Sequence, residues 1–396
     1  MQYKNIITAI VLSTIGTVSI CACSQKTEEF KSIDIGNAYD TREPVMASDY
    51  FSSIEYIPLE TTEASLLNGS GSLNLAVAQD RLLVLNNIFG ADPYVKSFDF
   101  SGKMLQFNAR FGRAEGEFYN AHYITVYDNE VFLIQQNDML IYDLDGNYRE
   151  TIKPSAGNFL MNRPFIIEKR LFGLLGDDFK EKKIFIDRID KTGQRIYGDP
   201  IASYSGEGGK PRYISRGGVN YPLPPKNPGS LYNQNEEVFF MIQSNDTLYT
   251  IDKELLQKSP EAIFDYGKYQ DSQSPKRVTF LLETPSFLMT KVLFKKDLFK
   301  PDNGYLMPPF IYDYATGKTR ILTYNEKFDK NGFVNDINDD ALLFMPELCR
   351  GNKMYELIDA IDFIDMAECS SSPKIKAIAA TITEESNPVL VIGTLK

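Results

Sequence analysis

Short apolar runs, separated by glycine, proline and aspartate, make up most of the chain after residue 46. The segment 129–150, NEVFLIQQNDMLIYDLDGNYRE, contains two such runs, a turn at Asp145–Gly146 and the start of a third run. Aromatic and β-branched residues dominate the runs, as is typical of strands. One stretch, 351–368, has apolar residues at three- and four-residue steps and predicts a helix packed on a sheet edge. The rest of the pattern predicts an all-β fold.

The β-type runs recur as a repeat. Each copy is an apolar strand ending near an aspartate, a tight polar turn and another strand, and the copies lie at 94–106, 138–150, 183–197, 246–256, 308–322 and, cut short by the end of the chain, 387–396. Their spacing approaches that of propeller blades, which have four strands in about 40–50 residues. A two-sheet sandwich would need fewer strands, and a β-helix would need a shorter repeat. We therefore predict a six-bladed β-propeller of four-stranded antiparallel blades.

Closure of this ring is predicted from its two ends. VLVIG (389–393) is a continuous apolar run, as expected of a buried strand, and IEYIPLE (54–60) is an unpaired strand candidate near the other end. Pairing of these two strands in the last blade would leave no open edge between the first and last sheets.

The stretch FDFSGKMLQFNARFGRAEGEF (98–118) has the glycines of a phosphate-binding loop. Such a loop would run straight into a helix, whereas the predicted strand YITVYD (123–128) follows here. Gly112 and Gly116 are therefore predicted to adopt positive φ and turn the chain from the outermost strand of one blade to the innermost strand of the next. Arg113, between them, is a candidate ligand-binding residue.

The N-terminus predicts export and lipid anchoring. Residues 6–20 carry no charge, are too few to span a bilayer as a helix, and fit the apolar core of a signal peptide. Ala22 before Cys23 resembles the bacterial lipobox, in which the cysteine after the cleavage site is acylated, with palmitate among the acyl chains; an ordinary signal peptide is the alternative. We predict three segments: a lipoprotein signal peptide over 1–22, a lipid anchor with a flexible tether over 23–45, and the propeller over 46–396.

Charge and the rare residue types exclude several functions. With 42 basic and 53 acidic residues the net charge is −11, which repels nucleic acids, so no nucleic-acid partner is predicted. His122 is the only histidine, which excludes a multi-histidine zinc site, and its place at a strand start predicts a packed or edge side chain. Besides the acylated Cys23, only Cys349 and Cys369 remain after signal removal, and whether they pair is open at this stage.

Several stretches together resemble one family, the six-bladed β-propeller lipoproteins of gut Bacteroidetes with NHL-like repeats. They are FDFSGKMLQ with FGRAEGEF, IEYIPLETT (54–62), NDTLYTI (245–251), FDYGKY (264–269), VNDINDDALLFMP (334–346) and NPVLVIGTLK (387–396). The resemblance implies the propeller fold and an outer-membrane lipoprotein. The acidic SQKTEEF after Cys23 resembles a signal for the outer face, with the periplasmic face as the alternative. Members of the family generally have no assigned activity, so the resemblance implies no chemistry.

The longest irregular stretch, 203–230, is the predicted binding region, because long loops without strand pattern are usually functional or disordered. Arginines can hold a carboxylate or sulfate through paired hydrogen bonds, and tyrosines can stack on a sugar or a peptide. The predicted ligand-binding residues are Arg212, Tyr213, Arg216 and Tyr221, together with Arg113. The function predicted is a binding module for an unidentified anionic glycan or peptide.

Two other functions stay open. A lactonase-like hydrolase or lyase would hold a divalent ion in the channel, but no spaced carboxylate cluster stands out and the lone histidine removes the commonest general base. A scaffold subunit of an outer-membrane complex is the third reading. From Asp336 the chain resembles a calcium-binding loop, with Glu347 at its twelfth position, but Ala341 replaces the required glycine. No catalytic residue and no cofactor is therefore predicted, with calcium as the alternative.

Overall fold

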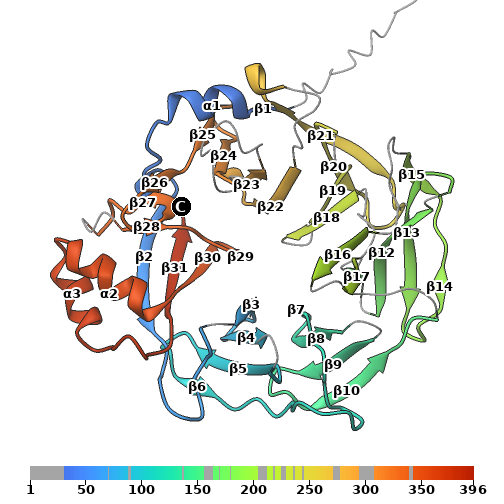
Figure 1. Cartoon of the computed structure of the whole chain (residues 1–396), viewed down its shortest axis with the longest axis horizontal. Coiled ribbons are helices and arrows are strands. Elements are labelled where there is room, and N and C mark those ends of the chain that lie inside the picture. The colour runs from blue at the N-terminus through green and yellow to red at the C-terminus, as the bar shows by residue number, and fades with distance from the viewer. Residues whose placement is uncertain are drawn as a thin grey trace, which may run out of the picture.

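Antiparallel sheets arranged in a ring form a β-propeller, seen down its axis in Figure 1. The innermost strand of most sheets lies near the middle of the ring, and later strands lie progressively outward. This computed structural model describes residues 31–69, 71–87, 91–135, 138–155, 164–168, 170–178, 180–203, 212–216, 219–223, 229–234, 237–242, 245–270, 277–293, 307–338 and 342–396.

Six sheets have four or five strands. The first is β3 (Ser72–Val77), β4 (Arg81–Asn87), β5 (Tyr94–Asp99) and β6 (Met104–Leu105). The second is β7 (Tyr123–Tyr127), β8 (Glu130–Ile134), β9 (Met139–Asp143) and β10 (Tyr148–Ile152). The third is β11 (Phe165–Glu168), β12 (Leu171–Asp178), β13 (Lys183–Asp190) and β14 (Arg195–Ile196), with β15 (Pro200–Ser203) also paired to β13.

The ring continues with the fourth, fifth and closing sheets. The fourth is β18 (Gly229–Gln234), β19 (Glu237–Ile242), β20 (Thr247–Ile251) and β21 (Lys258–Asp265), with β1 (Lys31–Asp34) added at its outer edge. The fifth is β22 (Arg277–Glu283), β23 (Phe287–Leu293), β24 (Pro309–Asp313) and β25 (Thr319–Ile321). The closing sheet is β29 (Leu348–Arg350), β30 (Lys353–Ile358), β31 (Val389–Leu395) and β2 (Phe51–Pro58).

The predicted count of six blades is wrong, because the described residues form seven sheets of three or more strands. The seventh, of β26 (Thr323–Asn325), β27 (Lys330–Val334) and β28 (Leu343–Phe344), follows the fifth sheet along the chain and precedes the closing one. The six repeats do correspond to six sheets: each copy supplies the third strand and, except at the chain end, the turn that leads to the fourth. The short strands of the seventh sheet carry no copy, so a count of repeats misses it.

Closure by the two chain ends is confirmed. Strand β2 pairs antiparallel with β31, with Ile54 opposite Gly393 and Tyr56 opposite Val391. On its other side β31 pairs with β30, so the terminal strand is central in the closing sheet. The ring therefore closes in a sheet that combines β2, the strand that precedes the first sheet, with the last strands of the chain, and leaves no free edge at the join.

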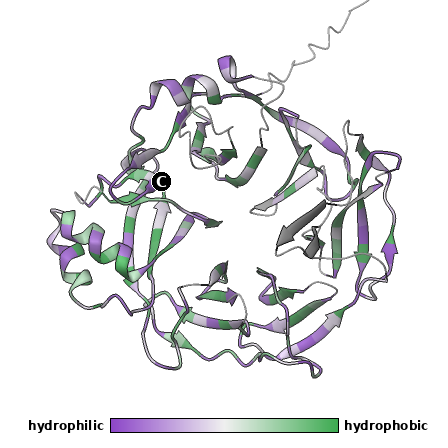
Figure 2. Cartoon of the chain, viewed as in Figure 1, coloured by the Kyte–Doolittle hydropathy of each residue, from purple (hydrophilic) through white to green (hydrophobic). Residues whose placement is uncertain are grey.

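The core consists of apolar layers between neighbouring sheets. In the described chain the buried side chains fall into six clusters, and the layer between the first and second sheets contains Leu83, Leu85, Val131 and Leu133. Figure 2 shows hydrophobic residues along the strands and hydrophilic residues in many turns of the rim. Because both faces of most sheets are covered in this way, their strands are apolar on both sides.

Residues 31–45, predicted as the end of a flexible tether, are folded. Strand β1 pairs in parallel with β21, and the helix α1 (Ile35–Thr41) follows it. The side chains of Ile33 and Ile35 are 1% and 0% exposed, so this segment contributes to the core between the fourth and fifth sheets. Residues 1–30, with the predicted signal peptide and Cys23, lie outside the described residues. Within the described chain, no helix has the length and apolar character to cross a membrane.

The helix predicted over 351–368 is wrong for its first half. Residues 353–358 form β30, and the helix α2 (Ala360–Cys369) begins only after it, followed by α3 (Pro373–Ala379). Strand β30 is buried on both faces, so apolar residues occur at every spacing and the helical period is not diagnostic. Two single-turn 3₁₀ helices complete the elements, η1 (Ala47–Asp49) and η2 (Gly267–Tyr269).

Candidate functional site

The predicted binding region 203–230 is not irregular throughout. Residues 212–216 and 219–223 form a hairpin of β16 (Arg212–Arg216) and β17 (Val219–Leu223), which pairs Arg212 with Leu223 and Arg216 with Val219. The absence of a strand pattern in the sequence was therefore misleading. Arg212, Tyr213 and Arg216 lie on β16 and Tyr221 on β17, and their binding role stays a prediction.

Arg113 lies in a different place, on the segment 106–122 that joins the outer strand β6 of the first sheet to the inner strand β7 of the second. We call this segment the connector. Its middle folds back on itself: Phe118 N–H donates to the carbonyl of Arg110 at 3.0 Å, and Gly112 N–H donates to the carbonyl of Phe118 at 3.0 Å. The predicted route from an outermost strand to the next innermost strand is confirmed.

The two glycines of the connector have different roles. Gly116 adopts φ +77°, as predicted, and the Tyr142 hydroxyl donates to its carbonyl at 3.2 Å. Gly112 does not have positive φ, so that part of the prediction is wrong. A Cβ there would lie 1.9 Å from the Glu117 carboxylate, so a larger residue would displace that side chain from the Ala114 N–H, which it accepts.

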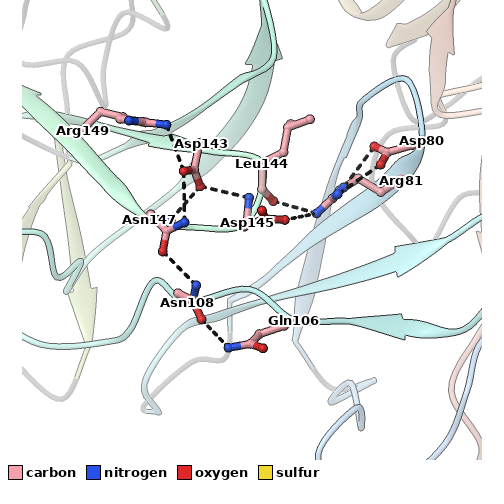
Figure 3. Close-up of polar contacts among 9 residues, drawn as sticks. All are labelled: Asp80, Arg81, Gln106, Asn108, Asp143, Leu144, Asp145, Asn147 and Arg149. Atoms are coloured by element: carbon pink, nitrogen blue, oxygen red, sulfur yellow. Dashed lines mark hydrogen bonds and ion pairs between the residues drawn. The ribbon is translucent and has the colours of Figure 1, made fainter.

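The start of the connector is fastened to the second sheet (Figure 3). Asn108 N–H donates to the carbonyl of Asp145 at 2.8 Å, and its side-chain amide donates to Asn147 at 2.9 Å. Gln106 in turn donates to the Asn108 side chain at 2.7 Å. The Arg81 guanidinium reaches the same turn from the first sheet, at 3.0 Å from both the Asp145 carboxylate and the Leu144 carbonyl. The connector therefore begins where side chains of two sheets already meet.

The turn that holds the connector is itself ordered by Asp143. Its carboxylate accepts the N–H groups of Asp145 and Asn147 and lies 3.1 Å from the Arg149 guanidinium. Partial burial pushes the pKa of Asp143 upward, but the hydrogen bonds from Asn147 and the charge of Arg149 outweigh it and hold the pKa below its usual value. The turn is thus held by an ionised carboxylate at neutral pH.

The end of the connector is held by a buried glutamine. The Gln135 side-chain oxygen accepts the N–H groups of Tyr119 at 2.9 Å and Asn120 at 3.1 Å, and its amide donates to Asp138. Burial raises the pKa of that Asp138 carboxyl. The backbone N–H of His122 donates to the Ile134 carbonyl at 2.9 Å, its side chain is half-buried just before β7, and burial lowers the pKa of its imidazole, which agrees with a packed or edge histidine. Both ends of the connector are therefore fixed, which pre-organises the side chains between them.

The fixed connector presents arginines and aromatic rings to solvent. Arg110 and Arg113 are exposed, as are Phe111 at 42% and Tyr119 at 38%. The Arg113 guanidinium carbon lies 5.8 Å from the ring centroid of Tyr119. Neither arginine forms an ion pair with any residue in the described part of the chain. Within the described chain, both guanidinium groups are therefore available to bind an anion.

Sequence reasoning singled out Arg113 but missed the other three residues. The available signal was the alternation of arginine and aromatic residues in ARFGR, 109–113. It was overlooked because an exposed phenylalanine cannot be told from a core one by sequence alone. Only the fold-back at Phe118 places Tyr119 beside Arg113.

The described residues of the calcium-like motif, which starts at Asp336, hold neighbouring segments together by hydrogen bonds. The Asp336 carboxylate accepts the backbone and hydroxyl groups of Ser48, and the Asn338 amide donates to the Ile54 carbonyl at 3.0 Å. Asp340 and Ala341 of the motif lie outside the described residues. Among the residues that are described, no three histidine, cysteine or acidic side chains are grouped to hold a metal ion. Cys349 and Cys369 are not joined by a disulfide.

Comparison with known proteins supports the fold. A family model described as a domain of unknown function, DUF4934, matches residues 30–394. A crystal structure described as a "Putative exported protein" from Bacteroides fragilis is similar with a TM-score of 0.60 and 16% identity, covering 92% of this chain and 99% of that one. At that identity the likeness shows the propeller fold alone.

More distant structures show weaker likeness. YCF48 from Cyanidioschyzon merolae has a TM-score of 0.37 and 9% identity, with 87% of this chain and 99% of that chain covered. The Pan2 WD40 domain of Neurospora crassa has the same TM-score and identity, with 89% and 98% covered. A comparison with curated proteins finds no match.

Proposed function

We propose, from the premise that this chain belongs to the DUF4934 family, that it is a cell-envelope binding module for acidic ligands. The connector carries this proposal: two exposed arginines without ion-pair partners in the described chain stand beside two exposed aromatic rings. On a protein of net charge −11, two exposed arginines three residues apart give this surface a local positive charge that favours an anion. The ligand class is an anionic glycan or an acidic peptide.

The binding proposal is tested with arginine variants of the connector. Each charge-assisted hydrogen bond contributes about 1.5–3 kcal/mol, so Arg110→Ala/Arg113→Ala should weaken binding of an acidic ligand by at least about a hundredfold. The measurement is a thermal-shift screen of anionic glycans and peptides, followed by titration of each hit on the variant. Arg350→Ala is the matched control, because it removes an exposed arginine from β29 in the closing sheet.

Two outcomes contradict this site. A ligand that binds the wild type and the double variant equally shows that the connector is not where it binds. If Arg212→Ala/Arg216→Ala abolishes binding instead, the site is the β16–β17 hairpin. Absence of any hit across the screen favours the scaffold reading over ligand binding.

The envelope location rests on Cys23 and is tested separately. An acylated cysteine with several chains gives stable attachment where a single chain is marginal, so Cys23→Ala should move the protein from the outer-membrane fraction to the soluble fraction. Cys21→Ala is the matched control and should stay membrane-bound. If the Cys23→Ala variant stays in the membrane and the Cys21→Ala variant is released, the lipid is on Cys21 and the prediction for Cys23 is wrong. Protease treatment of intact cells then distinguishes the outer face from the periplasmic face.

A further inference from the structure

We propose that the connector takes an acidic peptide in extended conformation, which adds to the connector as a short strand beside Phe111. The inference rests on the proposed binding function and names one of its two ligand classes. It is carried by the backbone geometry of residues 110–112, by the exposure of the side chains beside them and by their charge.

The backbone around Phe111 is half of a parallel bridge. Phe111 is the bridge partner of Phe118, and the two hydrogen bonds of the bridge are made by the carbonyl of Arg110 and the N–H of Gly112. In a parallel bridge the flanking residues supply these groups, so the N–H and the carbonyl of the central residue point away from the partner. Within the described chain, neither group of Phe111 has a hydrogen-bond partner. The backbone edge at Phe111 that faces away from Phe118 is therefore unpaired within the described chain.

An unpaired extended edge is the feature that strand addition requires, since main-chain hydrogen bonds supply the affinity and alternate side chains supply the specificity. Phe111 is 42% exposed, so its edge is accessible to another chain. An extended segment of the chain itself already pairs in this way, because β1 adds in parallel to the outer edge of β21. A second extended segment at the connector would use the same kind of contact.

Charge selects the kind of peptide. Arg110 and Arg113 flank the free edge on either side, and no carboxylate of the described chain pairs with them. The exposed ring of Tyr119, which lies beside Arg113, provides an apolar surface for the side chains between the acidic ones. A segment with glutamate at alternate positions and β-branched residues between them matches this arrangement, and a basic segment would be repelled.

The test compares a capped hexapeptide, Thr-Glu-Val-Glu-Thr-Glu, with the same peptide methylated on its backbone nitrogens at alternate positions. Titration of the labelled peptide with the purified protein, followed by fluorescence anisotropy, should show binding of the first peptide. N-methylation should weaken it by about fivefold to a hundredfold if two main-chain hydrogen bonds are lost. The lysine-for-glutamate peptide should not bind, and Arg110→Ala/Arg113→Ala should lose affinity while Arg350→Ala keeps it.

The outcomes separate this inference from the binding function beneath it. Equal affinity for the plain and methylated peptides would overturn strand addition and leave an acidic-ligand site. Binding of oligogalacturonate with no binding of either peptide would overturn the peptide class and retain the proposed function. If neither the peptides nor the oligosaccharide bind, both the inference and the proposed function fail.

Discussion

Removal of residues 387–396 should abolish the cooperative unfolding transition of the whole domain. The deleted segment includes β31, whose residues Val389, Leu390, Val391 and Ile392 are at most 3% exposed. Burial of each such side chain contributes about 1.5–3 kcal/mol, and the sum approaches the entire stability of a typical domain, about 5–15 kcal/mol. The strand also pairs with β2 and β30 at once, so its loss separates the two chain ends that close the ring.

Urea denaturation followed by circular dichroism and tyrosine fluorescence measures this effect. A matched control replaces the ten residues by a scrambled sequence of the same composition, which keeps the length and removes the apolar run opposite Tyr56. The scrambled protein should behave like the truncated one. A truncated protein that unfolds in a single transition at the wild-type midpoint would contradict the closure by β31.

Lys330→Ala is expected to have the second largest effect on the free energy of unfolding. Its ammonium lies 2.5 Å from the Glu356 carboxylate, which is only 6% exposed and also accepts the Met345 N–H at 2.8 Å. Lys330→Ala leaves this buried carboxylate without a counter-charge, which typically costs about 3–5 kcal/mol. Replacement of both partners, as in Lys330→Met/Glu356→Leu, should restore most of the loss, because it leaves no unpaired charge among the apolar residues.

The loss of stability caused by Lys330→Ala should depend on pH. Burial raises the pKa of Glu356 above its ordinary 4.5, against the opposing charge of Lys330. A carboxyl with a raised pKa favours its protonated form in the folded state, so stability falls as the pH rises from 4.5 through the folded-state pKa. Without Lys330 the pKa rises further, and the deficit of the variant should be small near pH 4.5 and largest at neutral pH. A deficit that does not change with pH would show that Glu356 is not the group affected.

Lys374→Ala is the control for this series. It removes an exposed lysine from α3 and should change the stability by no more than about 0.5 kcal/mol. A comparable loss in both lysine variants would indicate a general effect of net charge, which is already −11.

The sequence by itself determined the local units of this protein. Asp99, Asp143 and Asp190 each end a third strand, and each carboxylate accepts the N–H groups two and four residues further on. These hydrogen bonds join near neighbours in the chain, so the repeat of strand, aspartate and turn is sufficient to predict the hairpins. The propeller class and its closure by β2 and β31 followed from the same repeat and its incomplete last copy.

Tertiary structure alone decided the elements that depend on distant partners. The strand character of β30 and the folding of residues 31–45 come from pairing with β31 and β21, which no local pattern encodes. The candidate site divides in the same way. Arg113 was visible in the sequence, but the position of Tyr119 beside it depends on the anchoring of the connector at Asn108 and Gln135. Those anchors join the connector to the second sheet, and contacts of that kind exist only when the chain is folded.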